Sequence, residues 1–180
     1  MTPRVYKLHY EEDVSLPAGA GQIFSYADDF SKLSSHMNKS SSMMIGGSMK
    51  TFLDQARGQT VGSHVRMSGN IMGIEISLDE VVTDRDPPHH KAWETVGRQR
   101  LFVIDNYRLG FDIFENESDK SAKLRVFIDY NLPAAPLLRW LGLLFGRFYA
   151  KWCVQQIIND ARRHFMPATI LQPAIWPTRQ

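Results

Sequence analysis

The sequence has little cysteine, because Cys153 is the single one in 180 residues. One thiol excludes an intramolecular disulfide framework and any zinc or iron–sulfur site built from several cysteines. The charge is nearly balanced, at a formal +2, which gives no global electrostatic reason to bind nucleic acid. His89 and His90 are adjacent and follow two prolines, so we expect them in a solvated turn rather than around one metal ion. We therefore expect no metal, no cofactor and no nucleic-acid partner.

A long apolar run is missing as well. The most apolar stretch, residues 136–148, is interrupted by Arg139 and Arg147, and a membrane-spanning helix needs about 20 mostly apolar residues. The first ten residues lack the apolar stretch of a secretory signal, so we expect a cytoplasmic protein. Residues 136–180 carry six Lys and Arg against one Asp, a net charge of +5. That excess allows contact with an anionic surface such as a membrane, although a solvated helix face explains it more simply.

What the sequence does have is a regular alternation of apolar and polar residues. In residues 123–132 apolar side chains occupy every second position from Leu124 to Leu132, and residues 100–114 show the same period from Leu101. A two-residue period predicts antiparallel strands with one buried face. Turn signals recur between residues 43 and 132, so we expect about six consecutive strands there. A further strand is predicted in residues 5–14, with short helices in residues 18–28 and 30–37.

The end of the chain predicts one long helix, residues 136–165. Apolar side chains such as Trp140, Phe148 and Trp152 cover most of its circumference, so the helix must be buried against something broad, and the sheet is the only candidate. These elements predict an α+β helix-grip fold, in which a curved antiparallel sheet of about seven strands wraps around the C-terminal helix. Residues 1–165 form one domain in this prediction, and the proline-containing residues 166–180 form a tail.

Several segments of the chain resemble one known superfamily. They are residues 13–18 with Ile23 and Phe24, residues 81–97, residues 107–113, and residues 124–133 followed by the long helix. In these segments the chain resembles the SRPBCC superfamily, which includes START lipid-transfer domains, birch-pollen-allergen-like proteins and polyketide cyclases or aromatases. The resemblance covers about residues 5–165 and implies an apolar cavity between the sheet and the helix. It does not imply one activity, because the same scaffold serves carriers, enzymes and interaction proteins.

Strand parity and helix phase direct a set of mostly aromatic and methionine side chains toward that cavity. The candidate ligand-binding residues are Met67, Met72, Ile74, Trp93, Asp105, Tyr107, Phe111, Tyr130, Phe148 and Trp152. Asp105 is the acid among them, because it breaks the apolar row that runs from Leu101 to Leu109. A carboxylate that faces an apolar interior has a raised pKa, so Asp105 is the candidate catalytic residue or polar anchor. The alternatives are a bulge that turns Asp105 outward and, for the other residues, plain core packing.

The leading interpretation is a binding or carrier protein that holds a hydrophobic small molecule, such as a lipid or polyketide, between sheet and helix. The hydroxyl groups of Tyr107 and Tyr130 would orient this ligand. The first alternative is a cyclase- or aromatase-like enzyme that uses Asp105 and a tyrosine of the cavity. The second is an interaction module that docks through the basic helix and the tail on a protein, a ribosome or a membrane. The sequence leaves a homodimer open.

Overall fold

The computed structural model describes residues 4–33, 48–71, 74–97, 101–116 and 120–167. Within these residues one seven-stranded sheet has the order β1-β7-β6-β5-β4-β3-β2, and neighbouring strands are antiparallel throughout. The strands are β1 (Leu8–Leu16), β2 (Ser48–Leu53), β3 (His64–Ile71), β4 (Ile74–Asp86), β5 (His90–Thr95), β6 (Tyr107–Glu115) and β7 (Ala122–Tyr130). The helices are α1 (Ala20–Ala27), α2 (Phe30–Leu33) and α4 (Pro136–Phe165). The predicted α+β helix-grip fold is confirmed.

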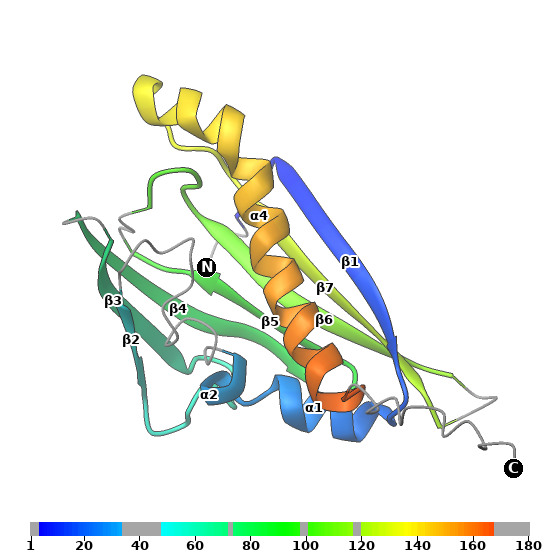
Figure 1. Ribbon diagram of the computed structural model, residues 1–180. Helices are drawn as coiled ribbons and strands as arrows, with labels where there is room; N and C mark the ends of the chain where they lie inside the picture. The colour runs from blue at the N-terminus through cyan, green and yellow to red at the C-terminus, as the bar shows by residue number, and fades with distance from the viewer. Residues whose placement is uncertain (1–3, 34–47, 72–73, 98–100, 117–119, 168–180) are drawn as a thin grey trace, which may run out of the picture.

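Figure 1 shows the sheet as a twisted surface with α4 lying across one of its faces. We call this the inner face. The helix packs against β1 and β7, while β2, β3 and β4 form the far side of the sheet. None of the described helices is long and apolar enough to cross a membrane.

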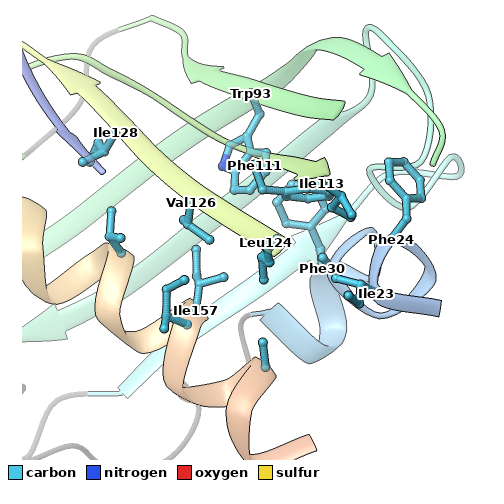
Figure 2. Packing of buried hydrophobic residues seen from close by; sticks show 14 of the residues in the cluster. Ile23, Phe24, Phe30, Trp93, Phe111, Ile113, Leu124, Val126, Ile128 and Ile157 are labelled. Carbon is cyan, nitrogen blue, oxygen red and sulfur yellow. The ribbon is translucent and has the colours of Figure 1, made fainter. Parts of the chain in front are cut away.

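The hydrophobic core lies between the inner face, α4 and the two short helices (Figure 2). Phe24 of α1 meets the ring of Phe111 edge to face at 5.7 Å, and Phe30 of α2 meets Trp93 in the same way at 5.0 Å. Such aromatic pairs add to the stabilisation that area burial alone provides. Ile157 reaches this cluster from α4. The two short helices therefore close one end of the interior.

A buried ion pair connects the short helices to the sheet. Lys91 of β5 is fully buried, and its Nζ donates to Asp28 Oδ1 at 2.6 Å and to the Asp28 carbonyl at 3.0 Å. Arg85 of β4 binds the same carboxylate through two hydrogen bonds of 2.9 and 3.2 Å. Burial alone would raise the pKa of Asp28, but its hydrogen bonds to Arg85 and Lys91 hold the pKa below the usual value. Each buried charge is thus compensated, as such groups require.

Two glycines let α4 approach the chain beside it. A Cβ at Gly142 would lie 2.8 Å from the Val103 carbonyl oxygen, and one at Gly146 would lie 3.0 Å from Leu132. Both contacts are too short for a larger residue. Farther along the helix, Ala150 and Val154 continue the buried side. Small residues therefore set the distance between α4 and the sheet.

The expectation that the whole apolar arc of the helix is buried is wrong. Trp140, Leu144 and Phe148 are 59%, 54% and 60% exposed. The physical reason is the side of the helix on which they lie. Gly142, Gly146 and Ala150 form the buried side of α4, and Trp140, Leu144 and Phe148 recur at four-residue spacing on the opposite side.

Candidate functional site

A carboxylic acid lies in the interior of the protein, in the middle of β4. Glu80 is 2% exposed, and the sheet register pairs it with Val65 on β3 and Thr95 on β5, both of which are also buried. Directly paired residues point to the same face, so Glu80 lies on the inner face of the sheet. Burial raises the pKa of Glu80 to about 7, although the neighbouring Tyr107 and Trp93 side chains act in the opposite direction. Near neutral pH this group can therefore either donate or accept a proton.

Tyr107 is the hydrogen-bond partner of this acid. Its phenol hydroxyl donates to Oε1 of Glu80, and the side chain is buried. Thr95 holds the backbone of Tyr107, because its Oγ1 accepts from the Tyr107 amide at 3.1 Å and donates to the Tyr107 carbonyl at 3.4 Å. Burial and the neighbouring Glu80 charge raise the pKa of Tyr107 well above its usual value. The phenol therefore stays neutral and keeps its proton.

Two polar atoms on the inner face have no hydrogen-bond partner among the described residues. They are Oε2 of Glu80 and Oγ1 of Thr51. The register pairs Thr51 on β2 with Met67, and Met67 with Leu78 on β4, so Thr51 lies in the row next to Glu80. A buried polar atom without a partner costs free energy, and most buried polar groups in proteins avoid this. These two atoms are therefore free to receive a hydrogen bond from, or give one to, a bound molecule.

The long helix contributes two further polar side chains. In α4 the neighbouring Cys153 and burial raise the pKa of Tyr149 well above its usual value, and the charge of Glu80 acts in the same direction on both side chains. Burial is the largest cause of the raised pKa of Cys153, which reaches about 12. The thiol therefore stays protonated and is a poor nucleophile. We use the name Glu80 cluster for Glu80, Tyr107, Tyr149 and Cys153, which come from β4, β6 and α4.

Several of the predicted ligand-binding residues are buried in the structure. Met67, Trp93, Tyr107, Phe111 and Tyr130 are all buried in strands of the sheet. Trp152 is half-buried on α4, with its ring 5.9 Å from that of Tyr149. Met72 lies outside the described residues, and for Ile74, the first residue of β4, only the backbone is described. No group of three or more His, Cys, Asp or Glu within the described part of the chain could hold a metal ion.

Two of the predicted orientations are wrong. Asp105 is exposed, and its Oδ2 accepts a hydrogen bond of 3.1 Å from the Asn106 side chain. The alternation of inward and outward side chains does not apply to Asp105, because β6 begins only at Tyr107. Just before this strand, the backbone groups of Asp105 and Asn106 are hydrogen-bonded to the backbone of Asn131. Phe148 is also exposed, because it lies on the side of α4 opposite the buried Gly146 and Ala150.

The acid that does face the interior was missed, although the sequence carries a signal for it. In β4 the residues Ile76, Leu78, Glu80 and Val82 share one parity, and all four are buried. Glu80 breaks an apolar row just as Asp105 does in residues 101–109. The difference is that Glu80 lies within a regular part of β4, before the register shift between Val82 and Asp84, so parity holds there and predicts the orientation.

Solved structures with this architecture include proteins that are named as enzymes. Norcoclaurine synthase from Thalictrum flavum is 12% identical, with a TM-score of 0.62 over 93% of this chain and 99% of that chain. The Zhui aromatase/cyclase from Streptomyces sp. R1128 is 13% identical, with a TM-score of 0.59 over 89% and 97%. Ara h 8.0201 is 11% identical, with a TM-score of 0.55 over 86% and 97%.

These solved structures share the fold of this chain. The expected resemblance is thereby confirmed at the level of the fold, and identities this low support nothing finer. No protein-family model matches the sequence, and no curated protein sequence matches it significantly. The function of this chain must therefore be argued from its own residues.

Proposed function

We propose that this protein binds a hydrophobic small molecule between the inner face of the sheet and α4, with the polar end of the molecule at Glu80. The observation that carries the proposal is Oε2 of Glu80, which is buried on the inner face without a partner among the described residues. A ligand hydrogen-bonded to this oxygen removes the free-energy cost of leaving it unpaired.

The surroundings of Glu80 fit the apolar part of such a ligand. Met67 and Leu78 lie in the adjacent row of the sheet, and Trp93 lies on the neighbouring strand. Methionine and aromatic side chains adapt to apolar molecules of varied shape. At about 25 cal/mol per Å², burying roughly 200 Å² of apolar ligand surface contributes about 5 kcal/mol. Apolar contact thus supplies most of the affinity, and Glu80 supplies orientation.

The chemistry of the site restricts the polar end of the ligand. Tyr107 already occupies Oε1 of Glu80, so one oxygen remains for the ligand. With its raised pKa, Glu80 accepts from an N–H or O–H group when ionised and donates to a carbonyl oxygen when protonated. We therefore propose ligands with one amine, hydroxyl or carbonyl group on an apolar body.

The test is a fluorescence titration with N-phenyl-1-naphthylamine, an apolar probe with a single N–H donor. We expect saturable binding to the wild-type protein, and at least about tenfold weaker binding to Glu80→Gln, because the glutamine amide presents a donor to the probe's donor. The matched control is Asp105→Asn, which changes an exposed acid in the same way and leaves the affinity unchanged. Absence of saturable binding, or equal losses in both variants, would contradict the proposal.

An acid–base enzyme is a second candidate, because Glu80 has a pKa near neutrality and a neutral tyrosine beside it. The exposed Asp105 does not fit the role of the internal acid that the sequence suggested. In this candidate Oε2 of Glu80 takes a proton from a carbon next to a ligand carbonyl, which leaves an enolate, and later returns a proton to the same carbon.

Solvent deuterium exchange at the activated carbon of 2-tetralone, an apolar ketone, tests this second candidate. The wild-type protein should accelerate the exchange measured by proton NMR, and Glu80→Gln should return the rate to that of buffer. A wild-type rate equal to that of buffer would exclude the acid–base role for this ketone while leaving the binding proposal intact.

A further inference from the structure

The N-terminal half of α4 carries large apolar side chains that nothing in the described structure covers. Trp140, Leu143, Leu144, Phe145 and Phe148 are each at least half exposed. Trp140, Leu144 and Phe148 follow one another at four-residue spacing, so they lie on one side of the helix. We call these five residues the helix patch. Isolated exposed apolar residues are common, but a group on one helix marks an interaction surface.

The charges around the helix patch all have one sign. Arg139, Arg147 and Lys151 are exposed on the same part of α4, and Arg147 and Lys151 continue the row that begins at Leu143. From Pro136 to Asn159 the sequence contains no acidic residue. No ion pair joins these three cations to a carboxylate of the described residues. The patch therefore combines apolar surface with uncompensated positive charge.

We propose that the helix patch is a docking surface for an anionic lipid bilayer. A helix that lies in a membrane interface has leucine and aromatic side chains on one side and lysine or arginine beside them, and tryptophan favours this interface. Most of the patch lies on the side of α4 turned away from the buried Gly142, Gly146 and Ala150, so it can enter a bilayer surface without unfolding any other element. Figure 1 shows that the N-terminal end of this helix extends past the sheet.

The charge pattern favours a bilayer over a second copy of this chain. In a two-fold symmetric dimer the same surface meets itself, which would bring Arg139, Arg147 and Lys151 of both copies together without an acidic partner on the patch. An anionic bilayer supplies the opposite charge over the whole surface, and each cation near it strengthens binding by about fivefold. The proposal does not depend on small-molecule binding in the interior.

The test is sedimentation of the full chain with vesicles of phosphatidylcholine alone and of phosphatidylcholine mixed with phosphatidylglycerol. We expect binding to the anionic vesicles only, reduced by at least about tenfold in the double variant Leu144→Glu/Phe148→Glu. The variant Arg147→Gln/Lys151→Gln should lose at least about tenfold as well. Substitution of exposed residues should leave the fold intact, which the thermal unfolding of each variant verifies.

Matched controls change exposed residues of the same kinds elsewhere. Val61→Glu/Phe114→Glu and Arg66→Gln/Lys123→Gln should bind the anionic vesicles like wild type. The proposal is overturned if wild type binds neither vesicle, or binds both equally. It is also overturned if light scattering shows a dimer that Leu144→Glu/Phe148→Glu converts to a monomer. Titration of Leu144→Glu/Phe148→Glu with N-phenyl-1-naphthylamine measures binding at the interior site separately from binding to vesicles.

Discussion

Replacement of Glu80 by glutamine removes a titratable group from the interior while keeping its size. In the folded protein burial raises the pKa of Glu80 from 4.5 to about 7. Between these two values the unfolded chain loses a proton that the folded chain keeps, so the stability of the wild type falls as the pH rises through this window. The difference of about 2.5 pKa units corresponds to roughly 3 kcal/mol. Below the window Glu80 is protonated in both states and contributes no such loss.

Glu80→Gln should therefore be about as stable as wild type near pH 4 and roughly 3 kcal/mol more stable near pH 8. For a chain of this length the gain corresponds to a melting temperature roughly 6–12 °C higher. Thermal unfolding of both proteins across this pH range measures the difference, in which the titration of all other groups cancels. The matched control is Glu115→Gln, an exposed acid at the end of β6, which should follow wild type. A difference between Glu80→Gln and wild type that does not change with pH would refute the reasoning.

The remaining predictions concern the buried ion pair. Asp28→Asn leaves the fully buried Lys91 ammonium without its carboxylate, so it should reduce the free energy of unfolding by roughly 3–5 kcal/mol. Lys91→Met keeps the volume and leaves Asp28 bound to Arg85, so it should cost roughly 2 kcal/mol or less. Urea unfolding at neutral pH compares the two variants, and a larger loss for Lys91→Met than for Asp28→Asn would contradict this account of the pair.

The order of the elements could be predicted from the sequence because strand and helix periods are local properties. The regular alternation in residues 123–132 predicted β7, and the long apolar stretch after Pro136 predicted α4 with its observed bounds. The alternation in residues 100–114 predicted a strand that is too long. Before Tyr107, the backbone groups of Asp105 and Asn106 are hydrogen-bonded to the backbone of Asn131 outside the regular strand pattern. Such a contact depends on a distant part of the chain, so a local pattern does not predict it.

The site could be predicted only in part, for the same reason. Tyr107 and Trp93 lie within regular strands, so parity gave their orientation correctly. The orientation of Asp105 depends on where β6 begins, and the exposure of Phe148 depends on which side of α4 packs against the body of the protein. Neither property is encoded in a local pattern. Strand parity also predicts that Glu80 faces the interior. Its hydrogen bond with Tyr107, however, could be found only from the three-dimensional structure.

The most direct test of small-molecule binding in the interior is an NMR measurement of magnetisation transfer between N-phenyl-1-naphthylamine and the side chains of the isotope-labelled protein. Our account predicts intermolecular nuclear Overhauser effects from the probe to the Met67 methyl group, the Leu78 methyl groups and the Trp93 indole. Effects confined to Trp140 and Phe148 on the projecting helix, with none to these three buried residues, would contradict it.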